Sequence, residues 1–356
     1  MLSARPAVSV VMVLAVLAAL AACAAPAAAP AAAPAPAQQA PAAQPAAQAP
    51  PEPKLVRITM ARSIGASIIW GMDQFASKYG LKTEYVAAST NADQQRNVQS
   101  GQVELATLGH HSPAMLADQG VNNVKVIAGL YSDGQNLIMR KGVDLPSWKD
   151  LEGKKIGRPP GTYVGILFTL AARANGVDLS RVNILDTTAS GTTELQALKN
   201  GDLDGFLMWG PAIDTAVVEG YGYYPPAVDI GSTKEYGNGN QILAANTDFL
   251  RDRQTVVNFL KAYAEAADYY TKNPDKWMDV AVQVTGADRA VLAEAIKHIN
   301  IDYRMDVSTA VNVAKYGAEF GFTKADQSAK VPEYIDFSYL AEATGQSVEQ
   351  LTRLVQ

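Results

Sequence analysis

The sequence predicts an α/β protein of two lobes, each built on a mostly parallel sheet with helices on both faces. Three observations support this prediction. Strand-like and helix-like segments alternate from about residue 54, the alternation starts again near residue 154, and the chain after residue 245 is mainly helical. Because a strand-like run at 241–245 follows the second series, we expect lobe 2 (142–240) to be inserted in lobe 1 (54–141 and 241–356).

The first series consists of short apolar runs, which are the expected strands, and longer amphipathic segments, which are the expected helices. The expected strands cover residues 55–60, 82–87, 105–108, 124–130 and 136–140. The expected helices cover residues 68–78 and 92–100, and Gly101 closes the second of them. Ser112 is expected to cap the next helix, with Pro113 at its first position.

The second series repeats this order with turn residues between its elements. The expected strands cover residues 154–157, 182–186, 203–209 and 241–245. The expected helices cover residues 163–174, 193–200 and 255–272, with further helical segments around Trp277, Val291 and Ala310.

The N-terminus is expected to be a signal peptide, residues 1–22, because an apolar run follows Arg5 and ends in small residues. Cys23, the single cysteine of the chain, comes directly after Leu20-Ala21-Ala22 and resembles the cysteine of a bacterial lipobox. That resemblance implies a lipid such as palmitate on Cys23. The alternative is an ordinary secretory signal that is cut within the alanine-rich stretch. Residues 24–53, almost entirely Ala, Pro and Gln, are expected to form a disordered tether.

Composition excludes several classes of function. The net charge of −5 and the absence of basic runs argue against nucleic acid as a partner. A lone cysteine leaves no disulfides or thiolate zinc sites, and three histidines leave little for metal or triad chemistry. His110 and His111 are adjacent, and neighbouring loop residues rarely reach one ion together. We therefore expect no metal, no cofactor and no catalytic residues, and we expect that the protein is not an enzyme.

Certain segments resemble a known family. A helix, a glycine turn and a strand follow one another at 99–106 and again at 195–205, and 250–274 resembles a late helix that ends in Asn-Pro. Trp209-Gly210-Pro211 is similar to a Trp-Glu-Pro motif, with glycine in place of glutamate. These features resemble type II periplasmic binding proteins of the branch that binds sulfonates, taurine, nitrate and thiamine pyrimidines. The resemblance implies a monomer that passes a small molecule to the permease and ATPase of an ABC importer.

In such sheets the ligand lies beyond the carboxyl ends of the strands. Four loops qualify, each joining small residues to a helix start, although any one of them is equally a turn with a capping hydroxyl. The candidate ligand-binding residues in and around these loops are Ser63, Trp70, His110, His111, Ser112, Asp133, Thr162, Tyr163, Ser190, Thr192 and Trp209. Trp209 fits a core position as well as a pocket position.

The aromatic side chains favour a planar vitamin-type heterocycle, riboflavin or a thiamine-pyrimidine precursor, as the ligand. The alternative is a small anion such as an aliphatic sulfonate, taurine or nitrate, held by Arg62 and Arg158. A second alternative is a lipoprotein that senses a solute without transporting it. In each case the protein is expected on the extracytoplasmic face of the cell membrane, in the periplasm if there are two membranes. Binding is expected to close the lobes about the strands at 136–140 and 241–245.

Overall fold

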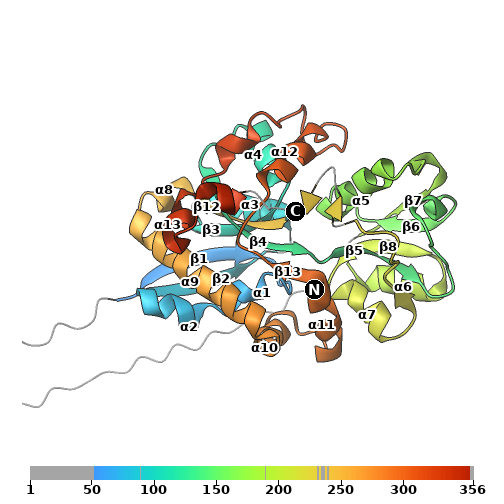
Figure 1. Ribbon diagram of the computed structural model, residues 1–356, viewed down its shortest axis with the longest axis horizontal. Helices are drawn as coiled ribbons and strands as arrows, with labels where there is room; N and C mark the ends of the chain where they lie inside the picture. The colour runs from blue at the N-terminus through green and yellow to red at the C-terminus, as the bar shows by residue number, and fades with distance from the viewer. Residues whose placement is uncertain are drawn as a thin grey trace, which may run out of the picture. The chain divides into compact units, whose positions relative to one another are not determined.

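The computed structural model describes residues 52–88, 90–188, 190–230, 232–233, 237–238 and 240–352 (Figure 1). The expected signal peptide, Cys23 and nearly all of the expected tether lie outside these residues. Within the described part of the chain, every helix is too short or too polar to cross a membrane.

The first sheet has six strands in the order β13-β4-β12-β3-β1-β2, and we call it and the elements packed on it lobe 1. Its strands are β1 Lys54–Met60, β2 Leu81–Ala87, β3 Leu105–Gly109, β4 Val124–Asp133, β12 Asn240–Asn246 and β13 Ile299–Ile301. Its early helices are α1 Ser67–Trp70, α2 Asp73–Ala76, η1 Ser77–Tyr79, α3 Asn91–Gln99 and α4 Ser112–Gln119. Strand β1 pairs in parallel with β2 and β3, whereas β12 runs antiparallel to β3 and β4.

The second sheet has five strands in the order β7-β6-β8-β5-β9 and forms lobe 2. Its strands are β5 Gln135–Arg140, β6 Lys155–Arg158, β7 Asn183–Asp186, β8 Gly205–Trp209 and β9 Gly222–Tyr223. Its helices are η2 Trp148–Leu151, α5 Tyr163–Ala174, η3 Leu179–Arg181, α6 Thr192–Asn200 and α7 Ala212–Val218. The predicted two-lobed α/β class is confirmed. Within it the sheets are mixed, because the strands that connect the lobes run antiparallel to their neighbours.

The chain changes sheets at a single residue. Strand β4 ends at Asp133 in the first sheet, and β5 begins at Gln135 in the second. Gly134 between them has a φ of +71°, a conformation that glycine adopts without strain. Residues 135–140, which we expected in lobe 1, therefore belong to the sheet of lobe 2. Strand β12 returns to the first sheet, as the sequence predicts.

The C-terminal part of the chain is mainly helical and packs on lobe 1. Its elements are α8 Thr247–Leu250, α9 Arg253–Lys272, α10 Pro274–Thr285, α11 Arg289–Ala295, η4 Ile296–His298, α12 Val307–Lys315, η5 Val331–Tyr334, α13 Ser338–Thr344 and α14 Val348–Thr352. Two further two-residue strands, β10 Ser232–Thr233 and β11 Gly237–Asn238, pair with each other. Helix α9 lies against α2 and α13 and buries Val256, Phe259 and Tyr263 in the core of lobe 1.

The helix expected at 68–78 is instead broken into α1, α2 and η1. Its interruption coincides with Gly71, whose carbonyl oxygen accepts a hydrogen bond of 2.8 Å from the Tyr270 hydroxyl. A Cβ atom at position 71 would lie 2.2 Å from that hydroxyl oxygen. The break therefore coincides with a contact from a residue that is far away in the sequence.

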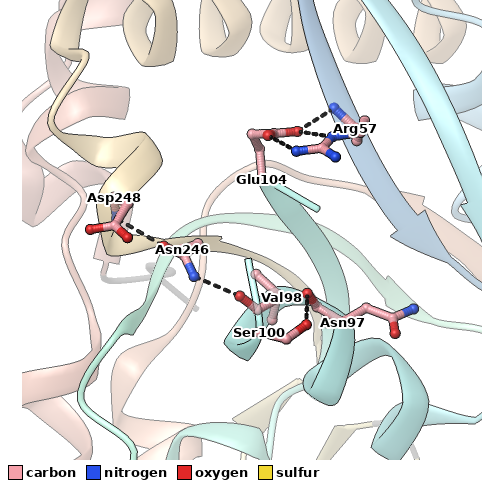
Figure 2. Close-up of polar contacts among 7 residues, drawn as sticks. All are labelled: Arg57, Asn97, Val98, Ser100, Glu104, Asn246 and Asp248. Carbon is pink, nitrogen blue, oxygen red and sulfur yellow. Dashed lines mark hydrogen bonds and ion pairs between the residues drawn. The ribbon is translucent and has the colours of Figure 1, made fainter. Parts of the chain in front are cut away.

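The glycine turn at 99–106 is held together at the amino end of β3 (Figure 2). The Glu104 carboxylate accepts hydrogen bonds from the backbone N–H of Arg57 at 2.7 Å and from its guanidinium at 2.6 and 3.1 Å. The Asn246 amide donates to the Val98 carbonyl at 2.7 Å. Since the carboxyl ends of the parallel strands lie at the other edge, this family-like segment supports the fold and lies away from the candidate ligand loops.

Candidate functional site

The loops at the carboxyl ends of the strands in the two sheets meet at two points. At the first, the imidazole of His111 after β3 stacks on the ring of Tyr163 after β6, with ring centroids 5.3 Å apart and planes 11° apart. At the second, Ile64 after β1 lies beside Gly210 after β8, where an added Cβ would be 3.7 Å from Ile64 Cδ1. The structure thus brings together loops of both lobes that the sequence selected separately.

Both histidines are buried. The Nε2 of His110 lies 3.1 Å from the carbonyl oxygen of Asp306. The His111 ring lies against the backbone of Gly109, where an added Cβ would be 2.8 Å from Nδ1, and meets Phe322 edge-on. Burial, and then the neighbouring His110, lower the pKa of His111 to about 4. His111 is therefore neutral at physiological pH.

Tyr163 is the first residue of α5, and its hydroxyl is buried without a hydrogen bond in the described chain. Burial raises its pKa far above the ordinary value, so the phenol keeps its proton. Thr162 is the N-cap of α5, which is the capping role that any of the four loops could have. Its hydroxyl accepts from the Gly165 N–H at 3.4 Å and donates to the Pro159 carbonyl at 2.7 Å. In this loop the Tyr163 hydroxyl is thus an unused donor, whereas the Thr162 hydroxyl is engaged in capping.

Arg158 is the last residue of β6 and places a positive charge at the same edge. Its guanidinium lies 3.5 Å from the Asp186 carboxylate, and its side chain is 32% exposed. Its Nε is buried and makes no hydrogen bond in the described chain. A donor left in this state costs free energy unless a partner satisfies it. Arg62, the other basic candidate, is exposed, with its guanidinium 5.9 Å from the Trp70 ring.

The loop before α6 uses its hydroxyl locally. The Ser190 hydroxyl accepts from the Thr193 N–H and donates to the Glu194 carboxylate, both at 3.1 Å. Thr192 begins the helix and is exposed. Gly191 precedes it with a φ of +77° and touches Ala212, so this loop packs against the start of α7. Ser190 therefore organises the helix start.

The loop after β1 packs on Tyr131 of β4. Ser63 accepts a hydrogen bond from the Ala66 N–H at 3.3 Å and also bonds to the Tyr131 side chain. An added Cβ at Gly65 would lie 2.4 Å from the Tyr131 ring, so only glycine fits here. Burial raises the pKa of Tyr131 to about 12. This loop is therefore fixed in place by lobe 1 itself.

The remaining candidates lie in different surroundings. Trp70 stacks on Tyr85, with centroids 4.6 Å apart. Ser112 is fully buried and accepts from the Asn91 amide at 3.1 Å; His111 holds the N-cap position, which corrects the capping role expected for Ser112. Trp209 is 39% exposed at the end of β8, which places it at the surface and not in the core. The backbone of Asp133 ends β4, but its side chain lies outside the described structure.

Sequence reasoning missed Asn91 and Asp214. The Asn91 side chain accepts from the Gly109 N–H at 2.9 Å and donates to Ser112, so it joins the end of β3 to the start of α4. Asp214 on α7 is 1% exposed and lies against Gly210. Neither stands in a motif, since each acquires its neighbours only by folding. Within the described residues, no three His, Cys, Asp or Glu side chains gather in a way that would hold a metal ion.

Residues 75–277 match the family model described as NMT1/THI5 like. The chain belongs to this family. The NMT1/THI5-like protein is 24% identical over 229 residues to the taurine-binding periplasmic protein of Escherichia coli, an alignment that covers 63% of this chain and 69% of the relative. It is 22% identical over 301 residues to a putative aliphatic sulfonates-binding protein of Bacillus subtilis, covering 82% and 88%.

Solved structures agree on the fold. The periplasmic aliphatic sulphonate binding protein SsuA of Escherichia coli superimposes with a TM-score of 0.68 at 15% identity, covering 80% of this chain and 92% of that one. The desulfurization enzyme DSZB superimposes with a TM-score of 0.62 at 12% identity, covering 82% and 99%. The NMT1/THI5-like chain therefore has the fold of the type II periplasmic binding proteins, which confirms the predicted resemblance. DSZB shows that an enzyme can also have this fold.

Proposed function

We propose that this protein is an extracytoplasmic solute-binding protein that captures a small anion, of the sulfonate, taurine or nitrate kind, for an ABC importer. The observation that carries the proposal is the pair of unused buried donors at the facing sheet edges, Arg158 Nε and the Tyr163 hydroxyl. A cation and a neutral hydroxyl are the groups that bind an anion well. The named functions of the taurine-binding and sulfonate-binding relatives support the same choice.

A planar heterocycle such as riboflavin or a thiamine-pyrimidine precursor has less support. Stacking needs an aromatic face that the protein leaves uncovered. The Tyr163 ring already stacks on His111, and the Trp70 ring stacks on Tyr85. Of the predicted aromatic candidates, Trp209 is the one with a large exposed area. We keep this ligand class as the second candidate because of that residue.

The binding role is preferred to catalysis because the candidate site offers binding groups. The pKa of His111, about 4, is too low for an effective general base near neutral pH, and Tyr163 keeps its proton, so neither is poised as a general base or a nucleophile. A role in sensing would use the same lobes. Deleting the gene for a neighbouring permease separates the two roles, because uptake of the ligand would stop only in the transport case.

A lipid on Cys23 would hold the protein at the membrane, and residues 24–53 would act as its tether. The test is a Cys23→Ser variant, followed by cell fractionation and labelling with radioactive palmitate. The wild type should carry label in the membrane fraction, and the variant should be unlabelled and released. Equal fractionation of both would contradict the anchor and favour an ordinary secretory signal.

The ligand is tested by thermal shift with taurine, an alkane sulfonate, nitrate, riboflavin and a thiamine pyrimidine. A true ligand at a thousandfold excess over Kd stabilises the protein by about 4 kcal/mol. We expect a shift with one of the anions that is lost in Arg158→Gln. The matched control is Arg181→Gln, because Arg181 pairs with Glu152 at the amino end of β7, at the far edge of the same sheet.

The possible outcomes separate the hypotheses. A shift with riboflavin or the pyrimidine alone would favour the heterocycle, and Trp209→Ala should then abolish it. An anion shift that survives Arg158→Gln would move the site away from β6. If none of the five compounds shifts the unfolding temperature, the proposed ligand class is wrong.

A further inference from the structure

Beside Gly210, the two lobes also meet where α7 of lobe 2 packs against α11 of lobe 1. Asp214 of α7 lies in this contact, and its carboxylate accepts a hydrogen bond of 2.6 Å from the Tyr224 hydroxyl. Its second oxygen is buried without a hydrogen bond in the described chain. An added Cβ at Gly210 would lie 2.7 Å from that oxygen and 3.3 Å from Ala295 Cβ of α11. The carboxylate is therefore enclosed by residues of both lobes.

Two titratable groups of lobe 1 face this carboxylate. His298 of η4 packs on the Tyr224 ring, with centroids 4.2 Å apart, and its Nε2 lies 3.6 Å from the Glu294 carboxylate of α11. His298 attracts the Asp214 carboxylate when it is protonated, and Glu294 repels it. With Tyr224, these are the ionisable groups that act on Asp214 from the surrounding elements. Asp214, Tyr224, His298 and Glu294 thus form one cluster across the lobe contact, and we call it the α7–α11 cluster.

Burial dominates the electrostatics of Asp214. It raises the pKa to about 6 from an ordinary 3.8, although the Tyr224 hydrogen bond and His298 oppose the change. Burying a charged carboxylate with one unsatisfied oxygen costs more free energy than burying the neutral acid. When the lobes separate, α11 moves away from α7 and water reaches the carboxylate.

We propose that the α7–α11 cluster is a proton-dependent latch, in which protonation of Asp214 favours the arrangement with the two lobes in contact. The device lies beside Gly210, next to the loop that follows β8, and it involves neither Arg158 nor Tyr163, so it acts with or without ligand. It would make capture of a solute at the cell exterior tighter in acid than in alkaline surroundings.

The sign follows from the linkage between protonation and closure. Burial between the lobes raises the pKa of Asp214, so closing takes up a proton if opening returns the carboxylate to water. The closed form gains most below pH 3.8, and the gain is lost as the pH rises through about 6. If opening restores the ordinary pKa of 3.8, the ratio of closed to open molecules falls about tenfold between pH 5 and pH 8.

The latch is tested without ligand by measuring the distance between two spin labels. Gln196→Cys on α6 and Lys272→Cys on α9 carry the labels in a Cys23→Ser background, since both positions are exposed. We expect the short-distance population to grow about tenfold relative to the long one from pH 8 to pH 5, with the rise beginning near pH 6. Asp214→Asn should stay in the short-distance arrangement at every pH. Asp202→Asn removes an exposed carboxylate of the same lobe and should behave like the wild type.

A second variant gives an independent readout. Tyr224→Phe removes the hydrogen bond that lowers the pKa of Asp214, so the onset of the rise should move to higher pH. If Asp214→Asn does not fold, as judged by circular dichroism, the Tyr224→Phe shift decides alone. A wild-type distance distribution that does not change with pH overturns the latch. A change that persists in Asp214→Asn, or an onset that does not move in Tyr224→Phe, overturns it as well. Each of these results leaves the anion-binding proposal untouched.

Discussion

Glu104 shows how one residue of a family-like segment contributes to stability. Its carboxylate binds three N–H groups of Arg57, a residue of the neighbouring strand β1. Burial alone would raise its pKa, but the hydrogen bonds and charge of Arg57 outweigh burial and lower it from 4.5. The turn itself, with Gly101 at a φ of +72°, was predictable from the sequence. The Arg57 partner was not, because nothing local connects residues that lie 47 positions apart.

We predict that Glu104→Gln lowers the free energy of unfolding by about 2 kcal/mol at pH 7. The stabilisation from a lowered pKa is present above pH 4.5 and is lost as the pH falls through the lowered value. The difference between wild type and variant should therefore shrink in acid. Urea unfolding at pH 7 and pH 4 measures it. Glu219→Gln is the control, because Glu219 forms only an exposed pair with Lys199 and should change little. A difference that is the same at both pH values would contradict the account.

At the scale of elements, the periodicity of the sequence predicted most strands and helices. The other elements differ from the prediction where long-range contacts occur. The strands at 82–87, 105–108 and 182–186 lie where the sequence placed them, within one or two residues. The helix expected at 68–78 is divided near Gly71, where Tyr270 of α9 closely approaches the backbone. The sheet change at Gly134 was also missed, because the expected strands at 124–130 and 136–140 were both assigned to lobe 1 and only pairing partners reveal two sheets.

Gly134 makes this sheet change testable. Its φ of +71° disfavours any side chain, and a Cβ would lie 2.8 Å from Ile299 Cγ1. We predict that Gly134→Ala lowers the free energy of unfolding by roughly 1 kcal/mol for the backbone and by about 1–3 kcal/mol more for the displaced neighbour. Gly142→Ala is the matched control, with a φ of +87° and open space around it, so only the backbone cost applies. Equal losses in urea unfolding would show that the close contact is unimportant.

At the scale of the whole molecule, α5 explains how the lobes hold together. The helix is buried on nearly every side, which is typical of a helix with two packing partners. Val164, Phe168 and Ala172 face the core of lobe 2, whereas Ile166 and Leu170 pack on Val313 of α12 in lobe 1. The apolar sequence of α5 was visible from the start, and so was the set of loops at the carboxyl ends. What the sequence did not reveal was which groups would remain unpaired there, because that depends on both lobes together.

Val313 tests this coupling because it belongs to lobe 1 but is buried against lobe 2. We predict that Val313→Ala weakens the contact by about 2 kcal/mol and speeds amide hydrogen exchange in α5 about 30-fold, as local opening becomes easier. Val124→Ala removes the same groups from a fully buried site within lobe 1 alone. It should speed exchange in the strands of lobe 1 and leave α5 unchanged. If each variant speeds amide hydrogen exchange equally in α5 and in the strands of lobe 1, the described chain opens as one cooperative unit. In that case α5 does not depend specifically on its second partner.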